Sequence, residues 1–346
     1  MNEEISEDNL EETNEITISD EEVNSLVNDT EQSKRQRIEI VNSWPTKNQF
    51  EIEKVFTKKL KTLSIQESFR PVNFNYSNEK YFQRSVAYIL DSLDFLPNRP
   101  DLAFDFIWRA IDFLSRESVS EENIPFNNDK DILKASVDIV WCNYFDQNLN
   151  IKNGLLTLLK CVPVQSCEYL FKRIYSIYDD SKPNNPNKEV SRLIGFDGGS
   201  VRNTQAKQII DLIKAKYPYS DTISRRKGSM FLYRYIKGDE LTILTDDSTQ
   251  TIKADFSQSL NFFVNGILYT FRNDRAHGGI FSPFRSSKAT MRTYAHCSFT
   301  FLLGYYLLIA LIHKRDSSLI TEETLKNNYN LNIELFKKLY GRNLKR

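Results

Sequence analysis

The sequence has few of the residues that bind metal ions or form disulfide frameworks. Its 346 residues include 4 Cys and 3 His, and no two of the cysteines form a CxxC pair. A structural zinc site usually needs such paired ligands, so the cysteines argue against this class of site. Four isolated cysteines in a long chain indicate reduced, mostly buried thiols. We therefore predict no metal, no cofactor and a cytoplasmic location.

Glycine and proline are scarce as well, with 11 and 10 residues. The sequence also contains no internal repeat of fixed period. These absences exclude collagen-like, repeat-dominated and wholly disordered proteins. Aromatic residues are plentiful instead, with 23 Phe and 17 Tyr. The composition therefore favours a compact, helix-rich body with a large apolar core.

One apolar stretch, residues 297–312, resembles a membrane span in composition but is short for one. It is interrupted by Ser298, Thr300 and Gly304, and a transmembrane helix needs about 20 predominantly apolar residues. We therefore predict a buried core helix and no membrane association. The sequence begins with MNEE, which has the wrong charge for a signal peptide.

Positive charge is absent from the beginning of the chain. The first 33 residues contain 12 Asp or Glu and neither Lys nor Arg. The whole chain has 46 basic and 46 acidic residues and a formal net charge of zero, so residues 34–346 carry a net charge of +12. The neutral total hides a basic body, which suits a polyanionic partner such as a nucleic acid.

We divide the chain into three regions. Residues 1–45 are acidic, polar and poor in aromatics. Such a segment cannot bury enough surface to offset its ordering entropy, so we predict a disordered tail, in which the apolar residues between 16 and 27 could form a transient amphipathic helix. Residues 46–180 form an N-terminal helical region with the early bundle helices, and residues 181–346 form a C-terminal helical region. The segment SKPNNPN, which begins at Ser181, is a linker signal at the boundary.

Apolar residues recur three and four residues apart along most of the body, which predicts an all-α fold. The predicted helix 101–115 is apolar around most of its circumference, so we expect it at the centre. Residues 229–245 are compatible with a small hairpin or with a helical turn. The predicted helices cover residues 50–63, 78–93, 101–115, 131–145, 154–159, 168–178, 256–271 and 287–314, and residues 188–216 are helical with an interruption at residues 195–199.

Arg272, Asn273 and His277 are the strongest candidates for catalysis. They follow the apolar helix 256–271 and precede the pair Gly278-Gly279, which predicts the end of the helix. Asn273 and His277 are four residues apart, so they share a face if the last turn stays helical. The three side chains supply a fixed cation, an amide and a group that titrates near neutrality. These are the groups that a metal-independent phosphodiester cleavage requires.

The run Arg-Asn-Asp-Arg-Ala-His, residues 272–277, resembles the Arg-x4–6-His signature of HEPN domains, including the preferred Asn after the Arg. The apolar helices on either side of the motif fit the same family, and the helix that contains Trp108 is similar to one of its early core helices. The resemblance implies a HEPN-type helical bundle, with additional helical segments in this longer chain. It also implies a homodimer in which two copies of Arg272 and His277 form one ribonuclease site.

Further basic residues surround the motif. We predict that Arg275, Arg285, Lys288 and Arg292 bind RNA, because each can contact backbone phosphates next to the site. The alternative for the last three is an ordinary charged helix start. His296 lies where the following helix becomes apolar, so we interpret it as a buried core or interface residue. The cluster Arg-Arg-Lys-Gly at residues 225–228 is interpreted as a loop that could touch RNA.

These observations lead to three hypotheses. In the first, the protein is a metal-independent endoribonuclease that serves in bacterial defence, a toxin–antitoxin pair or a stress response. In the second, it is a non-catalytic RNA-binding or complex-forming helical subunit. In the third and weakest, it is a toxin that a nucleotidyltransferase partner modifies. RNA, a second copy of the chain and an antitoxin or regulatory protein are the expected partners. The acidic tail either keeps the basic body soluble or imitates RNA and restrains the body.

Overall fold

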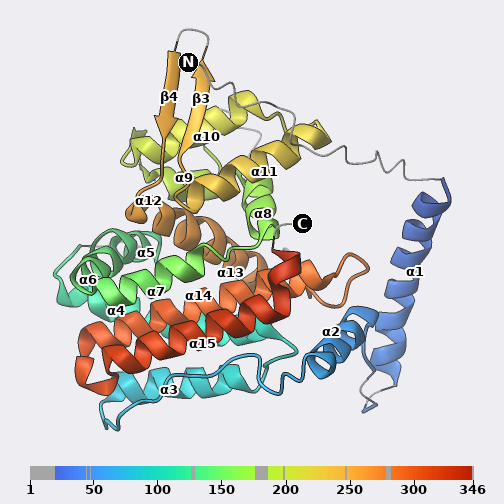
Figure 1. Cartoon of the computed structure of the whole chain (residues 1–346), viewed down its shortest axis with the longest axis horizontal. Coiled ribbons are helices and arrows are strands. Elements are labelled where there is room, and N and C mark those ends of the chain that lie inside the picture. The colour runs from blue at the N-terminus through green and yellow to red at the C-terminus, as the bar shows by residue number, and fades with distance from the viewer. Residues whose placement is uncertain are drawn as a thin grey trace, which may run out of the picture.

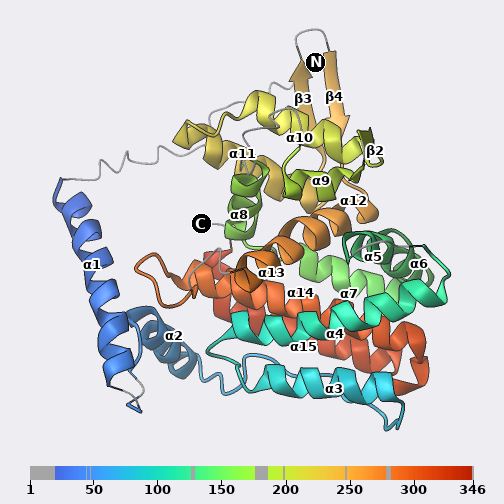
Figure 2. The same cartoon turned by 180° about the vertical axis from the view of Figure 1, so that it is seen from behind.

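The computed structural model describes residues 20–43, 45–46, 48–125, 129–175, 186–197, 199–245, 248–277 and 282–344. This part of the chain is predominantly helical and contains two short antiparallel hairpins. The prediction of an all-α fold is therefore confirmed. Figure 1 and Figure 2 show α3, α4, α14 and α15 as adjacent rods, with α9 to α12 and a hairpin packed over one side of them.

The first helices are α1 (Asp20–Asn42), α2 (Glu51–Thr62), α3 (Lys80–Leu93), α4 (Pro100–Glu121), α5 (Asp129–Ala135), α6 (Cys142–Gln147), α7 (Leu149–Leu159) and α8 (Val164–Ile174). The later helices are α9 (Lys188–Ile194), α10 (Thr204–Lys216), α11 (Thr222–Ile236), α12 (Phe256–Asn261), α13 (Tyr269–Ala276), α14 (Met291–Arg315) and α15 (Glu322–Tyr340). Two π-helical segments, Ser136–Trp141 and Phe262–Leu268, join α5 to α6 and α12 to α13. The hairpins pair β1 (Phe196–Asp197) with β2 (Ser200–Val201) and β3 (Leu241–Thr245) with β4 (Ser248–Ile252).

Helices α4 and α14 form the centre of the core. Phe104 and Ile107 of α4 are fully buried, and Gly304 lets α14 lie close to them, because an added Cβ would stand 3.2 Å from the Phe104 ring. The apolar window of α14 is 94% buried inside the fold. By length and composition α14 could cross a membrane, but its burial makes it a core helix, as the interruptions in its apolar stretch predicted.

The predicted division at Ser181 does not separate two cores. One continuous set of buried apolar side chains runs from Phe56 near the beginning of the body to Tyr340 near its end. Val190 and Ile209, which follow the predicted boundary, belong to this set. Segments on both sides of the boundary therefore stabilise each other, and the division into two regions stays a prediction.

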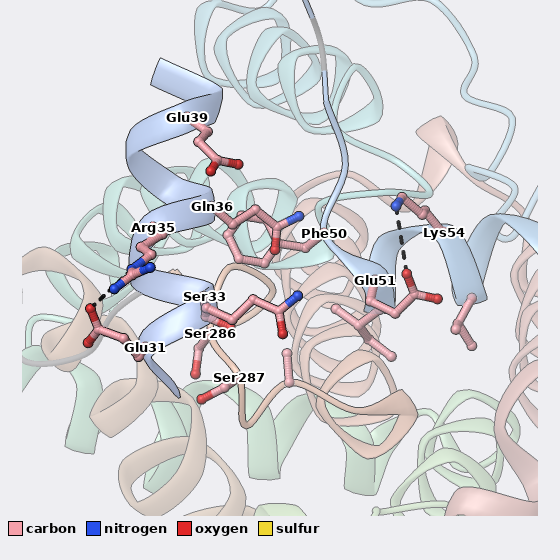
Figure 3. Close-up of a pocket in the computed structure, with 14 residues that line it drawn as sticks. Glu31, Ser33, Arg35, Gln36, Glu39, Phe50, Glu51, Lys54, Ser286 and Ser287 are labelled. Carbon is pink, nitrogen blue, oxygen red and sulfur yellow. Dashed lines mark ion pairs between the residues drawn. The ribbon is translucent and has the colours of Figure 1, made fainter. Parts of the chain in front are cut away.

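The prediction of a disordered tail is wrong for Asp20–Asn42, which forms α1; residues 1–19 lie outside the described residues. The segment is polar but rich in helix-forming Glu, Gln, Lys and Arg. Glu31 forms ion pairs within the helix with Lys34 and Arg35. Figure 1 shows α1 beside α2 at the edge of the molecule. Figure 3 shows the groove between them, bordered by Ser286 and Ser287 of the loop before α14.

Two local predictions around α11 need correction. The basic cluster at residues 225–228 lies inside α11 and not in a loop. Its glycine permits close packing, because a Cβ on Gly228 would come within 2.3 Å of the Phe171 ring of α8. For residues 229–245, the helical alternative holds up to Ile236, and the hairpin begins only at Leu241.

Candidate nucleic-acid site at the end of helix α13

The predicted helix 256–271 is a continuous helical run that carries the motif at its end. It comprises α12, the π-helical segment and α13, and its apolar residues Leu260, Phe263, Ile267 and Phe271 are buried. The ring of Phe271 lies against Phe104 of α4, with 5.5 Å between the ring centroids. The buried face thus orients α13, and the polar residues that follow Phe271 extend from an anchored helix.

Arg275 attaches this helix end to α4. Its guanidinium forms ion pairs with Asp101 at 2.8 Å and Asp105 at 2.6 Å. Asp101 is fully buried and also pairs with Arg99 at 2.8 Å. Burial opposes the charge of Arg275, but the hydrogen bond to Asp105 and the charges of both carboxylates outweigh it and raise the pKa of Arg275. This network of ion pairs holds α13 against the beginning of α4.

Asp274 attaches another side of the helix end to α8. Its carboxylate accepts hydrogen bonds from the Tyr169 hydroxyl and the Arg173 guanidinium. Burial and the nearby charge of Asp274 raise the pKa of Tyr169, so this hydroxyl remains a donor. Asp274 and Arg275 therefore hold one helical turn between two neighbouring helices. Such bracing limits the orientations that the adjacent motif side chains can take.

The motif residues remain accessible beside this bracing. Arg272 and Asn273 are half-buried, and His277 is exposed. The Arg272 guanidinium donates to the Asn273 amide oxygen at 3.0 Å. This hydrogen bond does not use the amide N–H groups of Asn273, which are the donors of that side chain. The His277 backbone N–H donates to the Asn273 carbonyl at 3.0 Å, so the last turn stays helical. As the spacing predicted, Asn273 and His277 thus share a face of the helix.

The four predicted RNA-binding residues differ in their surroundings. Arg275 is occupied by Asp101 and Asp105, which gives it a positioning role that the sequence analysis did not assign. Arg292 pairs with Glu168 of α8 at 2.6 Å. Arg285 and Lys288 are exposed on the loop before α14. Of the four residues, Arg285 and Lys288 are therefore the most accessible cations.

The other two histidines, His296 and His313, are buried, and burial was predicted for His296. The Nδ1 atom of His296 lies 2.8 Å from the Ser166 hydroxyl, and its ring contacts Phe271 at 5.0 Å between centroids. Burial lowers the pKa of His296 to about 4. His313 lies in the last turn of α14, hydrogen-bonded to Tyr144 at 2.9 Å. Among the three histidines, His277 alone is exposed.

Sequence reasoning missed the residues that position the site. Asp101, Asp105, Tyr169 and Arg173 lie far from the motif in the sequence and come together with it only in the folded chain. Their pairing partners, Asp274 and Arg275, were part of the motif run. The available signal was Asp101, a charged residue in the first turn of the strongly apolar helix α4, because buried charges in proteins are almost always paired.

Comparison with known proteins does not assign the chain to a family. No protein-family model matches it, and neither curated proteins nor solved structures contain a significant match. The resemblance to HEPN domains therefore depends on the motif residues and on their setting at a helix end. We treat both the family and the activity as proposals on that basis.

Proposed function

We propose that the protein is a HEPN-type, metal-independent endoribonuclease. One observation carries the proposal: Arg272, Asn273 and His277 are accessible at a helix end whose other charged residues are bound by α4 and α8. A solvated helix end needs no such bracing, whereas a catalytic group must be held close to its productive geometry. The net charge of +12 on residues 34–346 supports a polyanionic substrate.

The proposed reaction uses the 2′-hydroxyl of the RNA as the nucleophile. This oxygen attacks the adjacent phosphorus, and the bond between phosphorus and the 5′-oxygen breaks. One imidazole accepts the proton of the 2′-hydroxyl, and a second donates a proton to the leaving oxygen. The products are a 2′,3′-cyclic phosphate and a 5′-hydroxyl. Two acid–base groups are needed, and one chain supplies one accessible histidine within its described residues.

The requirement for a second imidazole supports a composite site in a homodimer. Two copies of α13 would place His277 and Arg272 from each protomer around one phosphate. Arg272 would bind the phosphate oxygens through its planar guanidinium and stabilise charge in the transition state. Asn273, whose amide oxygen already accepts from Arg272, would direct its N–H groups toward the phosphate or the imidazole.

The deciding experiment incubates RNA with wild type, His277→Ala and Arg272→Ala in the presence of EDTA and maps the new ends. Loss of general acid–base catalysis is expected to reduce cleavage about 10²- to 10⁴-fold. Arg116→Ala, which removes a partly exposed arginine of α4, is the matched control and should cut like wild type. Wild-type activity in His277→Ala, or products without cyclic phosphates, would refute the proposed mechanism.

The dimer has its own test. Specific activity should fall when the enzyme is diluted, in parallel with the dimer fraction measured by sedimentation. Constant specific activity for a monomer would refute the composite site but not RNA cleavage itself. A protein that binds RNA without cutting it, at concentrations where it is dimeric, would favour the non-catalytic subunit instead. A role in bacterial defence, in a toxin–antitoxin pair or in a stress response, and a cytoplasmic location, are parts of the same proposal.

A further inference from the structure

A second cavity lies between α8, α11 and the beginning of α14, with a volume of about 460 Å³. This volume falls within the range of about 300–1,000 Å³ that is common for small-molecule pockets. In Figure 1 and Figure 2, α8 lies between α11 and the α13–α14 region. The side chains that define the cavity's chemistry are Phe171, Lys172, Tyr219, Arg225, Arg226 and Arg292.

The inner part of the cavity is aromatic. Phe171 is buried and lines the cavity together with Tyr219, with 6.4 Å between ring centroids and 28° between ring planes. The guanidinium of Arg225 lies 5.2 Å from the Tyr219 ring centroid. Gly228 permits this arrangement, because any larger residue there would collide with Phe171. Aromatic rings and arginine planes are the surfaces on which unpaired nucleobases stack.

The rim of the cavity is basic. Lys172 from α8, Arg225 and Arg226 from α11 and Arg292 from α14 border it, so four cations from three helices converge. Glu168 is the single acidic residue of the lining, and its carboxylate pairs with Arg292 at 2.6 Å. Arg226 is exposed. An aromatic interior beneath several cations is complementary to a base that is attached to a phosphate.

Helix α8 connects this cavity to the candidate catalytic site. Tyr169 and Arg173 of α8 bind Asp274 beside the motif. Their neighbours in the sequence, Glu168 and Lys172, line the cavity, because consecutive residues point about 100° apart around a helix. Arg292 extends the cavity toward the loop that carries Lys288. An RNA strand bound at the end of α13 would thus reach a second binding surface on the neighbouring side of α8.

We propose that this cavity binds one unstacked nucleotide of an RNA strand. The base enters the space beside Tyr219, and the phosphate contacts Arg225 and Arg226. The inference takes its substrate class from the proposed ribonuclease function but does not depend on cleavage. It assigns a role to the basic cluster at residues 225–228 that goes beyond phosphate attraction, since the cluster and the aromatic rings act on the same nucleotide.

The test measures the affinity of a fluorescent single-stranded RNA by anisotropy, with all variants in the His277→Ala background so that nothing is cut. Tyr219→Ala should weaken binding about 5- to 100-fold, the range typical of losing one base stack. Tyr219→Phe should bind like the parent, because it keeps the ring. Tyr76→Ala, which removes an 87% exposed tyrosine that is not part of the lining, is the matched control and should also bind like the parent.

Arg226→Ala tests the basic rim. It should weaken binding and reduce the slope of log affinity against log salt by about one. Arg234→Ala, an exposed arginine of the same helix outside the lining, should change neither quantity. Urea unfolding of each variant verifies that the fold is intact, and the Tyr219→Phe result separates loss of the ring from loss of the fold.

Two results would overturn the proposal. The first is unchanged RNA affinity in both Tyr219→Ala and Arg226→Ala. The second is an equal loss of affinity for inorganic polyphosphate and for RNA in Tyr219→Ala, which would show that no base is recognised. Neither result depends on catalysis, whereas RNA cleavage by His277→Ala at the wild-type rate would refute the catalytic proposal and leave this one standing.

Discussion

The end of α13 and the helix α1 both carry charged side chains near the loop before α14, but the two regions hold their charges differently. At the end of α13, Arg275 and Asp274 are each about 11% exposed and pair with residues from other helices. In α1, Glu31 pairs with Lys34 and Arg35 of the same helix, and all three side chains are more than half exposed.

At the end of α13 the charges join neighbouring helices, whereas in α1 they lie at the surface of a single helix. A buried ion pair must be complete, because removal of one partner leaves an uncompensated charge in a medium of low dielectric. An exposed pair in water contributes little, since solvent screens both charges. The end of α13 is therefore a rigid platform for the motif. Helix α1 is attached near it through the hydrogen bond from Arg37 to the Arg285 carbonyl at 2.9 Å.

The largest expected effect comes from breaking the platform at Asp101. Asp101→Ala leaves Arg99 and Arg275 without their shared, fully buried carboxylate. We expect the free energy of unfolding to fall by about 3–5 kcal/mol. Urea denaturation measures it, with Glu31→Ala in α1 as the control that should change stability by less than about 0.5 kcal/mol. Equal losses in the two variants would abolish the distinction between the regions.

A somewhat smaller effect is expected on acidification. Burial lowers the pKa of His296 to about 4, so the unfolded chain binds more protons than the folded one below the ordinary histidine pKa. The stabilising contribution is complete above about pH 6.5 and is lost toward pH 4, by about 3 kcal/mol in total. His313 adds to the same trend, because burial lowers its pKa too.

Urea unfolding at several pH values between 4 and 7 measures this dependence. His296→Gln cannot titrate and should flatten the slope, even if its stability at neutral pH is reduced. Since His296 contacts Phe271 of α13, acid should loosen the end of α13 before it affects α1. An unchanged slope in His296→Gln would disprove the assignment.

Breaking the second side of the platform should have an intermediate effect. Asp274→Asn removes the charge that Arg173 and Tyr169 share. We expect a loss of about 1–3 kcal/mol in stability, typical of hydrogen bonds to a charged group, and slower RNA cleavage because the motif turn is less well held. Asp112→Asn breaks an exposed pair with Arg116 at 3.6 Å and is the matched control. If both variants behaved alike in urea and in the cleavage assay, Asp274 would not be a positioning residue.

The smallest effect on stability is expected from the acidic beginning of the chain. Deletion of residues 1–33 removes 12 negative charges and should change the free energy of unfolding by less than about 1 kcal/mol. If these residues restrain the basic body, the deletion should raise RNA affinity at low salt and less so at high salt. Unchanged affinity and salt dependence would show that the segment serves solubility alone.

Apolar spacing predicted the central helices well, because a helix that buries one face must repeat its apolar residues every three or four positions. The predicted central helix 101–115 lies within α4, and the predicted helix 287–314 overlaps α14. The predictions that were based on composition, and not on the spacing of apolar residues, were poorer. The polar segment Asp20–Asn42 forms a helix, and the cluster at residues 225–228 lies within α11.

The sequence by itself determined the helical class, the buried α14 and the candidate triad Arg272, Asn273 and His277. These features depend on local spacing, which any chain with this pattern would share. Only the tertiary structure decided that Arg275 braces α13 while Arg272 stays accessible. It also brought Phe171, Tyr219 and Arg226 around one cavity. Ion pairs and cavities join residues that are distant along the chain, so their partners are set by how the helices pack and not by the sequence around each residue.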